Sequence, residues 1–276
     1  MATAAQLESA WSVEPLVLAG VAVAAILFAR AFIRLRRRGR SDHASWSRAV
    51  IFGTGLALLT LALISPLDAA GDDDLLSAHM LQHMLIGDAA PALLLLAVRG
   101  PLIAFLIPAA AIRFTARHST AHAAVDRLGT PAVALAIWAA AMAIWHVPAL
   151  YDAALSRPWL HSSEHASFVF AGFLVWALLI DPAGRGRLSV KGRAAVAGCL
   201  FIFGQVMCDV LFLSPTPLYP AYAHHAHGLF GLTPLADQQY AGLLMNSEQF
   251  VTLGTCVTVL AWSLLQPVRR RPRLAY

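Results

Sequence analysis

The sequence contains two pairs of histidines with the same spacing, each at the start of a long apolar run. The first pair is His79 and His83, and the second is His161 and His165. Residues i and i+4 share one face of a helix, with Cβ atoms about 5–6 Å apart. Both imidazoles of a pair can therefore bind one metal ion. If the two runs lie side by side at the same depth, the pairs form a single metal site.

Further candidate ligands lie close to these pairs in the sequence or at the end of another apolar run. His146 ends an apolar run, Met80 and Met84 flank the first pair, and Met245 lies within the last run. Imidazole suits copper, zinc, iron and nickel, whereas thioether ligands favour Cu(I). The mixture of histidine and methionine predicts a copper site, with Cu(I) as the expected form and iron or haem as the alternative.

Carboxylates inside the apolar runs form a second signal. Asp88, Asp209 and Glu248 lie within such runs, and Glu164 stands between His161 and His165. A charged group in a membrane costs at least ~2.5–3.5 kcal/mol on insertion scales, so it normally faces a protein interior. We expect these four residues to orient the ligands from a second shell or to form a proton relay. An acidic stretch at residues 72–74, expected to be a loop, precedes the first histidine pair.

The elements that must position these residues are transmembrane helices. Hydrophobic residues make up 59% of the 276 residues and charged residues only 13%, against about 25% charged in soluble domains. The fold class expected is all-α, a polytopic membrane helical bundle forming a single domain over residues 1–276. Seven apolar runs are each near the ~20 residues that a bilayer requires; they span about 13–33, 47–66, 76–98, 130–150, 161–181, 194–214 and 238–265.

The basic residues predict the orientation of these spans. All 20 Lys and Arg residues except Arg157 lie in alternate connections, at the span ends that border these connections, or in the C-terminal tail. Cytoplasmic loops carry the excess of Lys and Arg, so the N-terminus is expected outside and the C-terminus in the cytoplasm. The histidine pairs and His146 then lie near the outer face. The basic side is expected to attract anionic lipids, and nucleic acid is not an expected partner.

The remaining histidines and the cysteines carry weaker signals. His118 and His122 repeat the four-residue spacing, but on a polar stretch within 99–129 where a solvated helix face is expected. Residues 99–129 form the longest cytoplasmic connection, with an interfacial or re-entrant piece at its start. His224, His225 and His227 lie in the outer loop 215–237. The three cysteines form no CxxC motif, so neither a disulfide framework nor a thiol redox motif is supported.

An ordered set of motifs resembles the CtaG-type cytochrome c oxidase assembly factors of bacteria. The set covers about 60% of the chain and comprises residues 79–85 (HMLQHML), 145–154 (WHVPALYDAA), 161–165 (HSSEH), 217–220 (PLYP), 231–239 (GLTPLADQQ) and 241–245 (AGLLM). The resemblance implies a multi-pass protein of the bacterial inner membrane that helps to assemble a haem–copper oxidase of the respiratory chain. It implies metal-binding positions at His79, His83, His146, His161 and His165, with Met245 as a further one.

The sequence departs from the family pattern at three places inside the spans. Asn246–Gln249 replaces the expected Trp, small apolar residue, Pro and Gly, and Gly87–Asp88 and Cys208–Asp209 stand where apolar or small residues are typical. These three polar replacements predict a divergent branch of the family.

Three functions follow from these observations. The first is a metallochaperone, not an enzyme, that binds Cu(I) at the outer face and delivers it to an oxidase subunit. Binding is expected to weaken below about pH 6.5, because protonated imidazole cannot bind a metal. The second is a membrane redox metalloprotein holding haem or two metal ions, and the third is a metal-ion or proton-coupled transporter. The sequence leaves the oligomeric state open.

Overall fold

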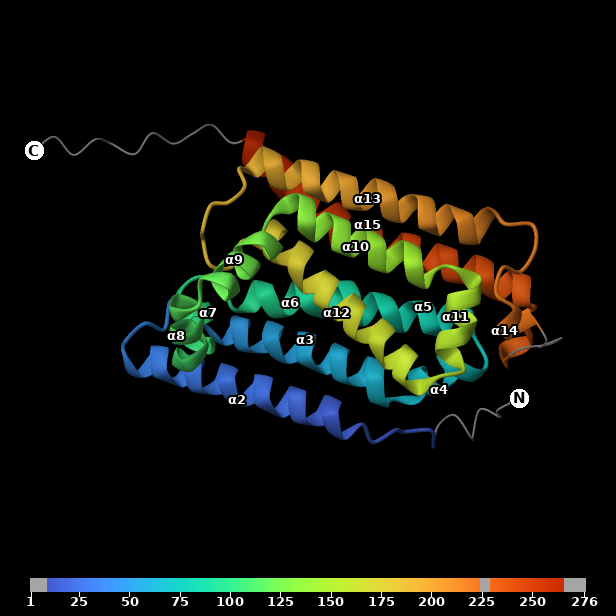
Figure 1. Cartoon of the computed structure of the whole chain (residues 1–276), viewed down its shortest axis with the longest axis horizontal. Coiled ribbons are helices and arrows are strands. Elements are labelled where there is room, and N and C mark those ends of the chain that lie inside the picture. The colour runs from blue at the N-terminus through green and yellow to red at the C-terminus, as the bar shows by residue number, and fades with distance from the viewer. Residues whose placement is uncertain (1–8, 224–228, 266–276) are drawn as a thin grey trace, which may run out of the picture.

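The computed structural model describes residues 9–223 and 229–265, which form helices and turns without any strand (Figure 1). Six helical segments in this part of the chain are long and apolar enough to cross a membrane. They are α2 (Pro15–Arg37), α3 (Trp46–Ile64), the segment Leu76–Ala97, α12 (Pro158–Ile180), α13 (Val190–Leu213) and α15 (Pro234–Leu265). All six lie within a few residues of predicted spans, so the all-helical membrane fold is confirmed.

The predicted span at 130–150 is the exception. Helix α10 (Pro131–Trp145) has only 15 residues, and it reaches spanning length only together with α9 (Ser119–Leu128), from which it is bent by 69°. The described residues therefore contain six spans, or seven if the bent pair counts as one. The helix ends early because Val147 is extended and Pro148 begins a new helix, α11 (Pro148–Leu155). Proline is favoured in the first turn of a helix, where its missing N–H is not needed.

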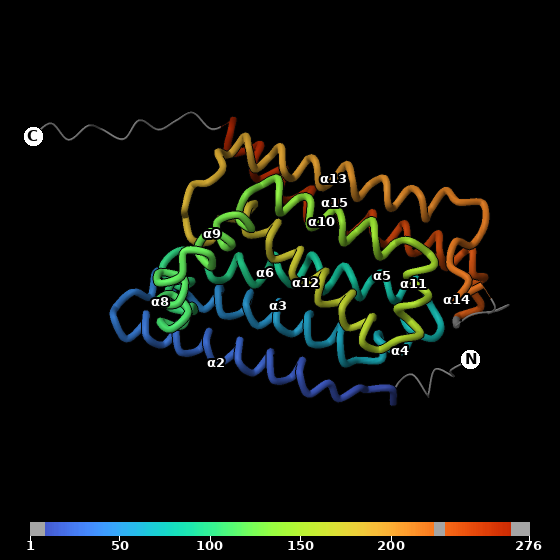
Figure 2. Tube along the Cα trace, in the orientation of Figure 1, coloured from blue at the N-terminus to red at the C-terminus, as the bar shows by residue number. Residues whose placement is uncertain are grey.

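The segment Leu76–Ala97 lies at the centre of the bundle. It consists of α5 (Leu76–Met84), the π-helix η1 (Leu85–Ala89) and α6 (Ala90–Ala97). It contacts α3, α12 and α15, while α10 packs on α12 and α13 packs on α15 (Figures 1 and 2). It is also the most buried of the six segments. Side chains on α5 can therefore meet side chains from both α12 and α15.

Short helices gather at the two ends of the bundle (Figure 1). One end carries α4 (Pro66–Asp73), α11 and α14 (Pro220–Ala223), and we call it the histidine end. The other carries α7 (Pro101–Leu106), α8 (Ala109–Arg117) and α9, and we call it the arginine end. The expectation of a loop at residues 72–74 was wrong for Asp72 and Asp73, which lie in the last turn of α4. The hydroxyl of Ser65 accepts a hydrogen bond from the Leu67 N–H at 3.3 Å, which caps this helix.

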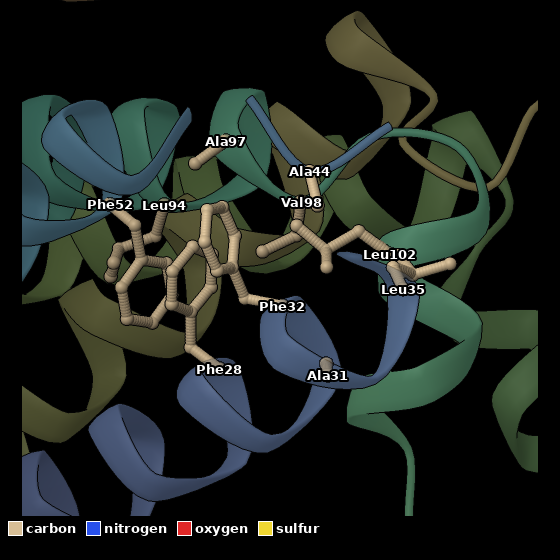
Figure 3. Close-up of a cluster of buried hydrophobic side chains, with 10 residues drawn as sticks. All are labelled: Phe28, Ala31, Phe32, Leu35, Ala44, Phe52, Leu94, Ala97, Val98 and Leu102. Carbon is tan, nitrogen blue, oxygen red and sulfur yellow. The ribbon is translucent and has the colours of Figure 1, made fainter. Parts of the chain in front are cut away.

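A cluster of aromatic and aliphatic side chains joins the edge helix α2 to α3, α6 and α7 (Figure 3). The rings of Phe28 and Phe52 stack with centroids 4.0 Å apart, and Leu94 and Leu102 are buried beside them. Between helices that lie in lipid, such side chains stabilise the contact through close van der Waals packing. In this way α2, which has few other neighbours, is held to the bundle at its arginine end.

Helix α12 approaches the central segment closely at two glycines. A Cβ atom on Gly172 would lie 1.9 Å from the carbonyl oxygen of Gly87. Small residues allow such close approach of helices in membranes. The contact sets the distance between α12 and the central segment, and therefore the distance between the histidines that the two helices carry.

Candidate metal centre

Four histidines from two helices meet at the histidine end of the bundle. His79 and His83 lie on α5 and His161 and His165 on α12, and each offers one ring nitrogen within 4.8 Å of those of the others. Neighbouring ring centroids are 4.1–6.1 Å apart. We call this group the His centre. The predicted convergence of the two pairs is what the structure shows.

The ring nitrogens of the His centre are buried without hydrogen-bond partners. Both nitrogens of His79 and His83, and Nε2 of His161 and His165, lack a partner among the described residues. Buried polar atoms in folded proteins are normally hydrogen-bonded, because leaving one unpaired costs about 1–3 kcal/mol. Four clustered imidazoles whose ring nitrogens have no hydrogen-bond partner form a donor set suited to a metal ion. The residues present are therefore compatible with a metal site.

Two carboxylates lie beside these imidazoles. Oδ1 of Asp72 is 3.4 Å from Nδ1 of His79 and 3.5 Å from Nε2 of His161, and Oε1 of Glu164 is 3.7 Å from Nε2 of His83. Glu164 is almost fully buried, and neither of its side-chain oxygens has a hydrogen-bond partner. These carboxylates can orient the rings, balance the charge of a bound cation, or bind it directly.

Contacts from other helices fix the position of α5. The Asp237 carboxylate of α15 accepts hydrogen bonds from the backbone N–H groups of Leu76 and Ser77 and from the Ser77 hydroxyl. It thereby caps the first turn of α5, whose N–H groups have no partner within the helix. Gln82, between the two histidines, donates hydrogen bonds to the Ala62 carbonyl at 2.8 Å and to Asp68. The rotation of α5 about its axis is therefore determined from three sides.

Helix α4 packs directly against the backbone of His79. A Cβ atom on Gly71 would lie 2.9 Å from Cα of His79, and the Gly71 carbonyl accepts a hydrogen bond from the Tyr222 hydroxyl. The hydroxyls of Tyr222 and Tyr151 are 2.9 Å apart, and the Tyr151 ring contacts that of His79. These contacts connect α4, α11 and α14 around the His centre.

The groups at this end that lie outside the spans have shifted pKa values. Burial raises the pKa of Asp72, and the nearby His161 partly opposes this rise. Burial also raises the pKa of Asp68 to about 6, against a lowering by its hydrogen bond from Gln82. Burial raises the pKa of the Tyr151 and Tyr222 hydroxyls. Both tyrosines therefore remain neutral hydrogen-bonding groups at physiological pH.

His146 is not one of the four converging histidines of the His centre, and the three predicted methionine ligands line a cavity beside it. His146 follows the last residue of α10, and its Nδ1 lies 2.8 Å from the Met142 carbonyl. Met80, Met84 and Met245 are buried in a neighbouring cluster and, with His146, line an adjacent cavity. The structure thus divides the predicted group of ligands into two neighbouring groups.

The predicted carboxylates also occupy different places. The Trp176 indole and the Thr252 hydroxyl donate hydrogen bonds to Asp88, the latter at 3.0 Å, and the side chain of Glu248 contacts Asp88. Asp209 accepts a hydrogen bond from Gln205 at 3.0 Å on its own helix. Of the four predicted carboxylates, only Glu164 lies within ion-pair distance of the His centre.

Sequence reasoning did not single out Asp72, Tyr151 or Tyr222 as members of this site. The acidic stretch before His79 was a signal for Asp72, but the helix that turns it toward the rings was not predicted. His118 and His122 are exposed, as expected for a solvated face, and His122 pairs with Asp126 at 3.1 Å. His224, His225 and His227 lie outside the described residues.

Comparison with known proteins bears on what this site does. The model of one protein family, the cytochrome c oxidase caa3 assembly factor (Caa3_CtaG), matches residues 26–267. The chain belongs to this family. The match includes both helices of the His centre, so this site is part of the region that the family shares.

Relatives and solved structures add little on function. The chain is 30% identical over 204 residues to the uncharacterized protein Mb0105 of Mycobacterium bovis and, to the same extent, to the uncharacterized protein MT0111 of Mycobacterium tuberculosis. The match covers 69% of this chain but only 30% of either relative, so both are much longer proteins. No solved structure matches the chain.

Proposed function

We propose that the protein binds Cu(I) as cargo at the His centre and delivers it to a subunit of the cytochrome c oxidase that its family helps to assemble. The observation that carries this proposal is the convergence of four buried imidazoles, with unpaired ring nitrogens, from α5 and α12. Cytochrome c oxidases contain copper, and imidazole binds copper well. Family membership supplies the client, and the His centre supplies the means of holding its metal.

The proposal includes the placement of the His centre at the outer face of the bacterial inner membrane. The basic residues of the connections 34–46, 99–129 and 182–193 support this orientation, because Lys and Arg concentrate on the cytoplasmic side. The N-terminus then lies outside and the C-terminus in the cytoplasm. Copper would be received from, and delivered to, proteins or domains on the outer side.

The different exposure of the ligands suggests a direction for exchange. The side chain of His79 is fully buried and that of His83 is 6% exposed, whereas His161 is 14% and Asp72 32% exposed. We propose that copper enters and leaves past His161 and Asp72, while His79 and His83 hold its inner side. Stepwise replacement of the outer ligands by those of a client would allow release without unfolding.

The decisive experiment compares two double substitutions with the same histidine spacing. His161→Ala/His165→Ala removes half of the His centre, and His118→Ala/His122→Ala removes an exposed pair as the matched control. Purified proteins are loaded with Cu(I) under reducing conditions, desalted and analysed for metal content. We expect the control to retain the copper of the unsubstituted protein and the first variant to lose the equivalent bound at the His centre.

Equal copper contents in the two variants would refute binding at the His centre. Delivery is tested separately, by measuring copper in the oxidase of cells that carry each variant. An oxidase that acquires normal copper with the His161→Ala/His165→Ala variant would exclude delivery from this site.

One observation favours a second candidate, a membrane redox protein with a metal that prefers mixed ligands. Asp72 and Glu164 lie within 4 Å of ring nitrogens, and histidine with carboxylate is the ligand set of di-iron sites in helical bundles. Haem is not favoured, since the rings contact one another and leave no gap for a porphyrin. Iron retained through purification, with a visible absorption band, would support this candidate over Cu(I), which has no visible band.

A further inference from the structure

A cavity beside the His centre is lined by methionines from four helices. Its volume is about 50 Å³, and its sulfur-bearing residues are Met80 and Met84 of α5, Met142 of α10, Met207 of α13 and Met245 of α15. These are all the methionines of the sequence after Met1. We call this space the methionine cavity.

Two imidazoles also line the methionine cavity. His146 directs Nδ1 to the Met142 carbonyl at 2.8 Å, while its Nε2 is buried without a hydrogen-bond partner. Donation from Nδ1 fixes the tautomer that leaves a lone pair on Nε2. His83 lines the cavity as well as belonging to the His centre. The unpaired nitrogen of His146 is therefore available as a ligand in the cavity.

Methionine packing alone explains only part of this arrangement. Methionine often fills irregular gaps in protein cores, but here its five side chains surround a space larger than the ~10–15 Å³ that one water requires. Neutral thioethers with one or two imidazoles form a ligand set that selects Cu(I) over divalent ions. Asp88 and Glu248 at the same cavity can balance the charge of a monovalent cation.

We infer that the methionine cavity is a second Cu(I) site, with His83 as the residue that links it to the His centre. The inference rests on the proposed function for the identity of the ion as copper. The inference adds that the protein holds two equivalents of Cu(I), one at the His centre and one in the chemically different methionine cavity. The His centre then exchanges with partners, and the methionine cavity stores Cu(I) away from water.

The probe is Cu(I) itself, added to selenomethionine-substituted protein at one and at two equivalents. X-ray absorption at the selenium edge then reports whether copper is bonded to a methionine. We expect a selenium–copper scattering path that strengthens between the first and second equivalents. Absence of this path at two equivalents would overturn the inference.

Substitutions separate this inference from the proposed function. Met84→Leu/Met245→Leu preserves side-chain volume, and it should lose one equivalent of Cu(I) while retaining the equivalent of the His centre. Leu179→Met, at a buried position outside the cavity, is the control for core substitution and should keep both. The His161→Ala/His165→Ala variant should lose one equivalent and retain the selenium–copper path.

Each outcome then bears on one site. If the His161→Ala/His165→Ala variant keeps both equivalents, the proposed function fails while a surviving selenium–copper path supports the methionine cavity. If the leucine variant keeps both, the methionine cavity is a packing feature and the proposed function stands.

A separate observation at the arginine end carries a second inference. A groove of about 960 Å³ lies between the C-terminal half of α2 and the α7–α8 segment. Four arginines line it: Arg30, Arg34, Arg37 and Arg38. None of them pairs with an acidic side chain of the described residues, whereas Arg187 and Arg193 at the same end do.

The rest of the groove is apolar. Its floor includes Leu27, Ile33, Leu106, Ile107 and Ile112, and the guanidinium of Arg38 lies 5.3 Å from the centre of the Phe105 ring. Guanidinium groups bind phosphate in paired hydrogen bonds, and apolar walls suit acyl chains. Basic pockets between helices at the cytoplasmic side of membranes hold anionic lipid headgroups.

We propose that one anionic phospholipid binds in this groove, with its phosphate on the arginines and its acyl chains along α2 and α7. The test is native mass spectrometry of protein in neutral detergent with phosphatidylglycerol, phosphatidylcholine or inorganic phosphate. We expect retention of phosphatidylglycerol only. Removing two arginines should weaken phosphatidylglycerol binding about 25-fold, at roughly fivefold for each basic residue.

Two charge-matched variants complete this test. Arg34→Gln/Arg38→Gln removes two groove arginines, and Arg113→Gln/Arg117→Gln removes two from α8 that do not line the groove. Equal loss of phosphatidylglycerol in the two variants would overturn the proposal. So would retention of phosphatidylcholine by the unsubstituted protein to the same extent as phosphatidylglycerol. Binding of inorganic phosphate with equal affinity would show an anion site without a lipid.

Discussion

Substitution of Gly172 by alanine should disrupt the His centre from a distance of two helical turns. Gly172 lies seven residues after His165 on α12 and carries no side chain that could bind metal. An added methyl carbon would lie 1.9 Å from the Gly87 carbonyl oxygen and 2.8 Å from its carbon. Both are backbone atoms of the central segment, so no side-chain rotation can relieve the overlap.

The size of the effect follows from this distance. Carbon–oxygen contacts between helices are typically about 3.3–3.6 Å, so the helices must separate by roughly 1.4 Å at the crossing. Such overpacking costs about 1–3 kcal/mol, and metal sites tolerate only about 0.2 Å in ligand distances. If α12 moves as a rigid helix, His161 and His165 move away from His79 and His83. We expect Cu(I) affinity to fall at least tenfold.

The assay is competition for Cu(I) against a chromophoric chelator, with thermal unfolding measured on the same samples. Two further glycines provide a graded comparison. Gly53→Ala meets nothing within 4 Å, and Gly87→Ala meets Phe168 Cβ at 3.3 Å. Affinity should be unchanged in the first and reduced slightly in the second. Wild-type affinity in a folded Gly172→Ala protein would refute the claim that this contact sets the geometry of the site.

Three further predictions concern α4 and α5. Gly71→Ala would meet the backbone of His79 at 2.9 Å, so it should cost about 1–3 kcal/mol and lower copper content; wild-type values of both would contradict it. Asp237→Ala removes the cap of α5, which should cost about 1–2 kcal/mol and lower the melting temperature, unlike Asp209→Ala. The pKa of Asp68 is about 6 in the folded state, against the ordinary 3.8. The folded state therefore favours the protonated carboxyl, and the free energy of unfolding declines as pH rises from about 4 through 6. Asp68→Asn should therefore raise the melting temperature at pH 8, by an amount equivalent to about 1 kcal/mol after discounting for partial exposure, and leave it unchanged at pH 4; an equal shift at both pH values would rule out titration of Asp68 as the cause.

The sequence was sufficient for six of the seven predicted membrane helices and for the shared helix face of each histidine pair. Apolar length fixes a span, and the spacing of four places both rings of a pair on one face. Whether α5 and α12 would be neighbours was not determined by either pattern. The packing of α5 against α12 depends on the contact between Gly87 and Gly172. These two glycines are far apart in sequence, so the contact can be recognised only in the folded structure.

Two proline signals in the sequence mark short helices at the histidine end. Ser65–Pro66 and Val147–Pro148 each begin a short helix, in keeping with the preference of proline for the first turn. These signals are sufficient to predict α4 and α11, and the first of them places Asp72 on a helix. The separation of His146 from the His centre could not be read this way, because depth in a membrane says nothing about position around the bundle.

The π-helix in the central segment explains how one helix serves both groups of ligands. In a regular α-helix of 3.6 residues per turn, Asp88 would be rotated about 140° from His83. In the π-helix over Leu85–Ala89 the hydrogen bonds run from residue i to i+5, so residues five apart come closer to one face. Asp88 and His83 consequently line the same cavity. The sequence departs from the family pattern at Gly87–Asp88, and both residues set this geometry. Gly87 allows the close approach of α12. Asp88 provides the carboxylate that accepts hydrogen bonds from Trp176 and Thr252.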